Sequence, residues 1–293
     1  MKFRKYLLQF ALCILPLLSS SQNGYEYMGL IKLNDSTAIT YKISISERNG
    51  AVTGYSLTDL GGEHETRSNI LGEYDKVNNE LNFRETSIVY TKSPITQEDF
   101  CFINTTFKKF SFEKAKKIKA NFVGLFSDNT RCIDGELLMN SVEKVEARLD
   151  KMVSKINKST KVSDSTKQKI NALRLMDSLN LNILKKNQTL SVFSKSKKVS
   201  LTIYDGGKAD GDKITIYANN KVVLNNYEAN KQKRIITLNL VDVKTSIVIK
   251  AENEGKIAPN TVIVEIEDGK NNIKALSNLK QGETTQIDFL KAQ

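Results

Sequence analysis

The chain contains a single histidine, His64, and few of the residue patterns that carry enzyme chemistry. A histidine-based zinc site or a pair of catalytic histidines would need a second imidazole. Neither a G-x-S-x-G motif nor a phosphate-binding loop occurs, so hydrolases of that serine type and P-loop enzymes are excluded. A pair of carboxylates is left open, and a carboxylate-based hydrolase is kept as a remote alternative. We therefore expect a protein that is not an enzyme.

Long apolar runs are scarce as well, and the one that matters lies at the N-terminus. Residues 6–18 are almost entirely apolar, follow three basic residues and precede three serines. This pattern is typical of a secretory signal peptide, and we predict that residues 1–21 are removed. The run is shorter than the roughly 20 residues that span a bilayer, so we expect no transmembrane segment after cleavage. The predicted localisation is exported, in the periplasm, on the outer surface or outside the cell.

Cysteine is nearly absent from the mature chain, which keeps only Cys101 and Cys132. An even number in an exported protein predicts a disulfide, with two buried thiols as the alternative. A bridge closing about 30 residues would stabilise the fold by roughly 3 kcal/mol. Strands two apart are separated by about 9.6 Å, whereas bridged Cα atoms lie within about 7 Å. At least one cysteine is therefore expected in a loop.

The excess of positive charge is confined to one region of the chain. Removal of the signal peptide lowers the net charge from +11 to +8, and residues 141–198 alone carry +9. The flanking regions, 22–140 and 199–293, carry −2 and +1. We expect no nucleic-acid partner, because an exported chain meets little nucleic acid and most of this one is near neutral. Lipopolysaccharide, acidic glycans or membrane headgroups are the expected polyanions.

Residues 22–140 alternate with the period of two that marks strands with one buried face, as at Ile39, Tyr41, Ile43 and Ile45. Regular short strands joined by turns favour an eight-stranded antiparallel β-barrel of the lipocalin or avidin kind. Gly72 lies in one of these aromatic-bearing strands, where glycine lets a closing sheet bend. Such an interior is either filled by side chains or holds one small ligand or glycan. We predict strands at about 25–33, 37–46, 51–59, 64–74, 80–91, 100–108, 116–126 and 131–139.

Residues 141–188 are patterned as a basic helical hairpin that connects two β regions. Apolar residues at spacings of three and four mark a first helix near 142–156, and the polar segment 157–166 separates it from a second. The hairpin would bury Val142, Val145, Leu149, Met152, Ile156, Ile170, Leu173, Met176, Leu179 and Ile183. A stripe of cations follows the first helix at the same spacing, at Lys144, Arg148, Lys151, Lys155 and Lys158.

This basic stripe has three interpretations. It could contact an anionic polymer or a membrane surface. It could instead be a solvated face that keeps a spacer soluble, which is the commoner role of such charge runs. Self-association through the apolar seam is the third.

Residues 189–293 return to short alternating strands with few glycines, which fits an immunoglobulin-like β-sandwich. With the barrel and the hairpin, the predicted fold class is mainly β with a helical connector. The predicted strands lie at about 199–204, 213–217, 221–227, 233–240, 245–252, 261–268, 272–278 and 284–290.

Acidic residues gather in the first loop of this sandwich. Asp205, Asp210 and Asp212 share this loop with three glycines, and several carboxylates with tight turns suit Ca²⁺. If each strand reverses direction, the loop holding Asn253 and Asn260 lies at the same end and adds oxygen donors. Ca²⁺ is therefore the one cofactor the sequence suggests. The alternative is that these side chains only shape the loop through Asx-turns.

Two motifs resemble those of a group of secreted flavobacterial proteins. The sequences Asp210-Gly211-Asp212-Lys213-Ile214 and Ala251-Glu252-Asn253-Glu254-Gly255, with Pro259-Asn260-Thr261 after the second, are similar to a C-terminal module of that group. Residues 55–62 and 90–94 resemble its N-terminal β-barrel module. The resemblance implies export and a two-module architecture, and it implies no function.

Two functional hypotheses follow. The first is an exported, non-catalytic binding or cell-surface protein whose barrel holds a small ligand or glycan. The second is a structural or assembly protein of the cell envelope, with solid β modules and a basic contact helix.

Overall fold

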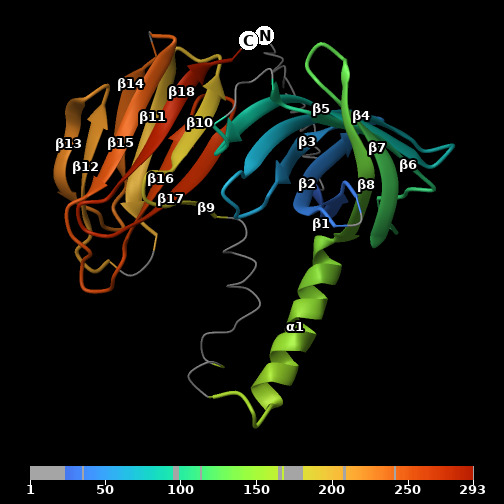
Figure 1. Ribbon diagram of the computed structural model, residues 1–293, viewed down its shortest axis with the longest axis horizontal. Coiled ribbons are helices and arrows are strands. Elements are labelled where there is room, and N and C mark those ends of the chain that lie inside the picture. The colour runs from blue at the N-terminus through green and yellow to red at the C-terminus, as the bar shows by residue number, and fades with distance from the viewer. Residues whose placement is uncertain are drawn as a thin grey trace, which may run out of the picture.

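The computed structural model describes residues 24–34, 36–94, 99–112, 114–163, 167, 181–206, 209–240 and 242–292. The predicted signal peptide and most of the predicted second helix of the hairpin lie outside the described residues. The prediction that this helix extends to Ile183 is wrong, because Ile183 lies in a short strand, Asn182–Leu184, that pairs with the sandwich. What is described is mainly β, with one long helix between a barrel and a sandwich, as the sequence predicts (Figure 1).

Most of the predicted strands are found within two residues of their expected bounds. The first module contains β1 (Gly24–Lys32), β2 (Ala38–Arg48), β3 (Ala51–Thr58), β4 (Thr66–Asp75), β5 (Glu80–Thr91), β6 (Phe102–Lys108), β7 (Lys117–Leu125) and β8 (Arg131–Ser141), followed by α1 (Val142–Lys158). The second contains β9 (Asn182–Leu184), β10 (Thr189–Ser194), β11 (Lys198–Asp205), β12 (Lys213–Ala218), β13 (Lys221–Glu228), β14 (Arg234–Asn239), β15 (Lys244–Ala251), β16 (Asn260–Glu267), β17 (Asn272–Leu279) and β18 (Thr284–Lys291).

The first eight strands form a closed antiparallel barrel. Each pairs with its neighbour in the chain, β1 pairs with β8, and this last pairing closes the ring. Large side chains fill the interior because every second residue of a strand points inward, and many of them are aromatic. The largest fully buried members of this cluster are Tyr27, Ile43, Ile45, Ile70, Leu81, Phe107, Phe110, Leu137, Met139 and Tyr41.

The predicted disulfide is present between Cys101 and Cys132, with the Cα atoms 6.0 Å apart. Cys101 lies just before β6, so one cysteine is in a loop, as the strand spacing requires. The bridge passes over the intervening strand β7 at Gly124, where a Cβ atom would collide with the Cys101 sulfur. Glycine is therefore required at this position by the disulfide and also by the carbonyl oxygen of Ile133, which a Cβ atom would meet as well.

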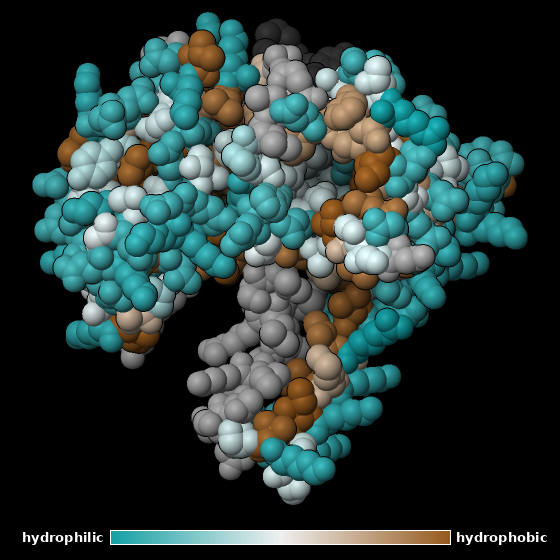
Figure 2. Space-filling model, in the orientation of Figure 1, coloured by the Kyte–Doolittle hydropathy of each residue, from teal (hydrophilic) through white to brown (hydrophobic). Residues whose placement is uncertain are grey.

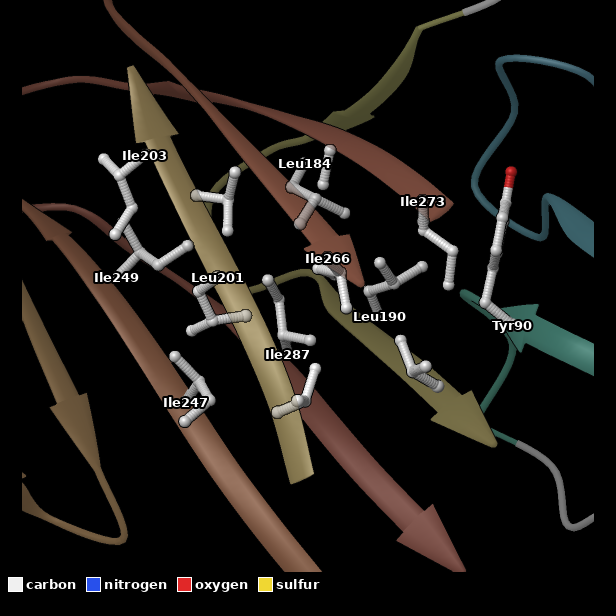
Figure 3. Close-up of a cluster of buried hydrophobic side chains, with 14 of the residues drawn as sticks. Tyr90, Leu184, Leu190, Leu201, Ile203, Ile247, Ile249, Ile266, Ile273 and Ile287 are labelled. Carbon is white, nitrogen blue, oxygen red and sulfur yellow. The ribbon is translucent and has the colours of Figure 1, made fainter. Parts of the chain in front are cut away.

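The second module is a sandwich of two sheets. One sheet has the order β14-β11-β16-β17-β9, and the other contains β13-β12-β15-β18-β10. Aliphatic residues from both sheets meet in one core, which includes Leu201, Ile247 and Ile287 (Figure 3). The sequence missed β10 and also β9, which has only three residues and lies in the range assigned to the connector. It pairs in parallel with β17, and β10 pairs in parallel with β18.

The barrel and the sandwich are joined through both a sheet and a core. Strand β10 pairs antiparallel with β5 of the barrel, which makes a single sheet of thirteen strands. Leu57, Val89 and Tyr90 of the barrel belong to the apolar cluster of the sandwich. Figure 3 shows Tyr90 at the edge of that cluster, on the side of Ile273. The two modules therefore share buried surface.

A buried polar contact seals the same junction. The ammonium of Lys92 donates to the carbonyl of Ile183 at 3.1 Å and lies 3.9 Å from the carboxylate of Glu65. That carboxylate also accepts from the hydroxyl of Tyr90 at 2.8 Å. Burial lowers the pKa of Lys92 despite the neighbouring carboxylate.

Helix α1 continues directly from β8 and extends away from both modules (Figure 1). Its 17 residues give a length of about 25 Å. Only Val142, at its N-terminal end, is buried, and Met152 further along the seam is 49% exposed. Within the described ranges, α1 is too short and too polar to cross a membrane, and no other described helix could do so.

Candidate functional site

The acidic loop predicted from the sequence lies at one end of the sandwich, together with the loop that carries Asn253. We name the side chains of Asp205, Asp210, Asp212, Asn253 and Asn260 the oxygen cluster. Strand order explains why they meet, because β11 and β15 end where β12 and β16 begin. The prediction that these loops share an end is thus confirmed.

Hydrogen bonds fix the two loops to each other. Asp210 accepts from the backbone N–H of Ile257 at 2.7 Å, and Asp212 Oδ2 accepts from that of Thr261 at 2.7 Å. Asn253 accepts from the backbone N–H of Lys213 at 2.7 Å, which ties the second loop to the start of β12.

The side chain of Asn260 completes this network with its amide group. Its Nδ2 donates to the carbonyls of Lys213 and Asn253, at 3.1 and 3.0 Å. The cluster therefore has the structural role that the sequence allowed as an alternative to metal binding.

Two oxygens of the cluster are not accounted for by this network. Oδ1 of Asp212 and Oδ1 of Asn260 are buried and accept no hydrogen bond from the described residues. The residues themselves are 1% and 0% exposed. Buried acceptors without a donor are costly, so in native proteins they usually face a donor, a water molecule or a cation.

The charges around Asp212 are of one sign. Burial raises the pKa of this carboxyl, and the charges that raise it further belong to Asp210, Asp205 and Glu254. Glu254 directly follows Asn253 in the second of the two loops. In the described part of the chain, no group of three or more His, Cys, Asp or Glu side chains is arranged to hold a metal ion. A cation here would therefore depend on amide and backbone oxygens as well as carboxylates.

The basic stripe lies on α1. Arg148, Lys151, Lys155 and Lys158 are exposed and Lys144 is partly covered. None of the five forms an ion pair with any residue that the structure describes. Figure 2 shows hydrophobic side chains along one side of α1 and hydrophilic ones along the other. The same helix also carries acidic residues, and the one in its first turn is Glu143.

The barrel interior contains one polar group that the sequence analysis missed. Glu85 is buried among the aromatic rings and accepts hydrogen bonds from the hydroxyls of Tyr41, at 2.9 Å, and Ser56. Its other oxygen accepts from the backbone N–H of Ile103 at 2.8 Å. Burial raises the pKa of Glu85, although these bonds oppose the change. The sequence does contain a signal for this burial. Glu85 follows Leu81 by four residues in the same strand, so the two side chains point to the same face.

A groove of about 1420 Å³ lies on the outer face of the barrel. It is lined by amide and charged side chains from β4 to β8, among them Asn82, Arg84 and Asn121, together with the apolar Val123. Strand β6 pairs with β7 only as far as Thr105, whose hydroxyl instead donates to the carbonyl of Asn121 at 2.8 Å. No β6–β7 pairing is found beyond this point, and residues of both strands line the groove.

The single histidine lies in an exposed loop near the module junction. The Nδ1 atom of His64 is 3.3 Å from the hydroxyl of Ser93, and the backbone N–H of His64 donates to Asp59. Among the described residues, no carboxylate is placed by a hydrogen bond on the other ring nitrogen. The geometry of a serine triad is therefore not assembled by the described residues.

Comparison of the chain with protein-family models, with curated proteins and with solved structures finds no match in any of the three. Its function is therefore inferred from the residues and the geometry above.

Proposed function

We propose that this is an exported, non-catalytic protein of the cell envelope, in which the barrel and the sandwich form one rigid body and α1 contacts an anionic surface. The observation that carries the proposal is the basic stripe on a projecting helix. Its five cations have no ion-pair partner among the described residues, and α1 leaves the β modules at its first turn. Such an arm can reach a charged surface while the rest of the molecule stands away from it.

The packing of the two modules supports a structural rather than a ligand-carrying role. Tyr27, Tyr41, Phe107 and Phe110 occupy the barrel interior. The shared sheet and core at Tyr90 would hold the sandwich in a fixed position relative to the arm. Export, on which the proposal also depends, is supported by the N-terminal sequence and by the disulfide, because disulfides persist in oxidising compartments.

The proposal is tested by sedimenting the mature chain with vesicles of phosphatidylcholine containing phosphatidylglycerol, at low and at high salt. Each cation near an anionic lipid surface contributes about 1 kcal/mol. Replacement of all five residues of the basic stripe by Gln should therefore weaken binding on the order of 100-fold or more at low salt. Binding of the unchanged chain should fall steeply as salt is added.

The matched control removes the same amount of charge elsewhere. Five exposed lysines of the sandwich have no ion-pair partner among the described residues and can be replaced by Gln together: Lys221, Lys231, Lys270, Lys280 and Lys291. This control should bind as the unchanged chain does. Equal loss in both variants would show that only net charge matters and would refute a role for α1. A soluble acidic polysaccharide, tested as a competitor, distinguishes a polymer from lipid headgroups as the natural surface.

The second candidate function is the binding of a glycan or another small polar ligand, and the outer groove of the barrel favours it over the interior. The groove offers amide and guanidinium donors beside an apolar floor at Leu71 and Val123. Substitution of Arg84 by Ala, at an exposed position in the groove, should then abolish retention on an immobilised glycan while leaving vesicle binding unchanged.

A further inference from the structure

Two buried oxygens of the oxygen cluster are not explained by the hydrogen bonds that fix the shape of its loops. The network between the two loops uses one oxygen of Asp212 and the amide nitrogen of Asn260. It leaves the second oxygen of each side chain buried and without a donor from the described residues. Asn260 follows the loop after β15 and Asp212 precedes β12, so the two oxygens come from different loops held at one end of the sandwich.

The electrostatic surroundings favour a positively charged occupant over a neutral one. The carboxylates that act most strongly on Asp212 are those of Asp210, Asp205 and Glu254, and no cation is among those charges. Two lysines at the ends of these loops pair with carboxylates outside the cluster, Lys213 with Glu228 at 3.9 Å and Lys250 with Glu252 at 3.0 Å. Buried negative charge is expensive unless an opposite charge compensates for it.

We propose that the oxygen cluster is a Ca²⁺ site, with Oδ1 of Asp212 and Oδ1 of Asn260 as ligands and with further oxygens from Asp205 or Asp210 and the adjoining backbone. The ion would link the loop after β11 to the loop after β15. It would remove the need for a donor at both buried oxygens and neutralise part of the acidic charge.

The chemistry of the donors selects Ca²⁺ among the common metal ions. Only oxygens are available, whereas zinc and copper prefer nitrogen or sulfur. Mg²⁺ demands a regular octahedron and gives up its water reluctantly, while Ca²⁺ accepts six to eight oxygens in irregular geometry, including neutral carbonyls. An irregular set of carboxylate, amide and backbone oxygens from two loops suits Ca²⁺. Extracellular Ca²⁺ modules of this kind bind at roughly 0.1–1 mM.

Two other occupants would satisfy the same oxygens. A buried water molecule could donate to both of them. Alternatively, a protonated Asp212 could donate to Asn260 directly, because burial and neighbouring carboxylates favour its neutral form. Neither alternative makes the stability of the protein depend on Ca²⁺.

The test is thermal unfolding of the mature chain in Ca²⁺, in Mg²⁺ and in chelator, together with equilibrium dialysis against radioactive Ca²⁺. At about 100 times the dissociation constant, Ca²⁺ should raise the unfolding midpoint by roughly 5 to 10 °C, and Mg²⁺ should not. Dialysis should give one ion per chain. Equal midpoints in Ca²⁺ and chelator would overturn the proposal.

Variants locate the site. Asp212→Asn should lose most or all of the Ca²⁺-dependent rise in the unfolding midpoint. The matched control is Asp268→Asn, because Asp268 is a buried aspartate in the loop between β16 and β17 that accepts bonds from the backbone N–H groups of Lys270 and Asn271. This variant should lower the midpoint without changing the response to Ca²⁺. A full Ca²⁺ response retained in Asp212→Asn would place the ion elsewhere and refute the assignment.

Hydrogen exchange on the unchanged chain also tests the location of the ion, and it does not require a variant that folds. Addition of Ca²⁺ should slow exchange in the peptides around Asp212 and around Asn260. Protection confined to any other part of the chain would overturn the proposal.

Discussion

Tyr90 of β5 lies opposite Val192 of β10, and this pair joins the barrel to the sandwich in one continuous sheet. Both side chains are buried in the apolar cluster at the junction. Because the junction shares a sheet and a core, neither module can unfold without exposing apolar surface of the other.

We therefore predict that the mature chain unfolds in one cooperative transition. Differential scanning calorimetry should give a single peak whose calorimetric enthalpy equals the van't Hoff enthalpy. Two separated peaks would show that the modules are independent.

A charge placed at the junction should destabilise both modules together. Val192→Asp puts a carboxylate at a fully buried position and should lower stability by about 3 kcal/mol or more. The matched control is Val222→Asp in β13, where the side chain is 53% exposed and the expected effect is below about 0.5 kcal/mol. Urea unfolding followed by circular dichroism measures both.

The carboxylate inside the barrel should be needed for its hydrogen bonds rather than for its charge. Glu85→Ala leaves the hydroxyls of Tyr41 and Ser56 and the N–H of Ile103 without their acceptor, and each such loss costs about 1–3 kcal/mol. Glu85→Gln should cost much less, because its carbonyl can accept from Ile103 while the two hydroxyls rotate to accept from its amide. Equal urea midpoints for the Ala and Gln variants would contradict this.

The same residue should make stability depend on pH. The pKa of Glu85 is raised in the folded protein, so the folded state keeps a proton that the unfolded state releases. Between the ordinary pKa of glutamate and the raised value, the folded state binds more protons, and stability falls as the pH rises through that window. The difference in stability between the unchanged chain and Glu85→Gln, measured from pH 4 upward, should show this fall. A difference that does not change with pH would exclude Glu85 as the titrating group.

The disulfide should stabilise the barrel mainly through the unfolded chain. Replacement of Cys101 and Cys132 together by Ser opens a loop of 31 residues and should cost about 3 kcal/mol in urea unfolding under oxidising conditions. Under reducing conditions the unchanged chain should approach the stability of the variant. An unchanged midpoint after reduction would show that the bridge contributes nothing.

Local patterns in the sequence determined much of the fold. Alternation of period two gave the strands of both modules to within a few residues, since an inward side chain at every second position is a local requirement. The same regularity placed the loops of Asp212 and Asn253 at one end of the sandwich, because antiparallel strands reverse direction at each turn. The spacing of apolar residues likewise predicted the helix that became α1.

Contacts between distant residues were decided only by the tertiary structure. The pairing of β5 with β10 joins segments about a hundred residues apart, and no local pattern specifies that partner. The donors to Glu85 come from three different strands, so its burial is visible only once the barrel closes. The two buried oxygens that suggest Ca²⁺ also depend on closure, because the sequence shows which residues carry oxygens but not which of them keep a donor.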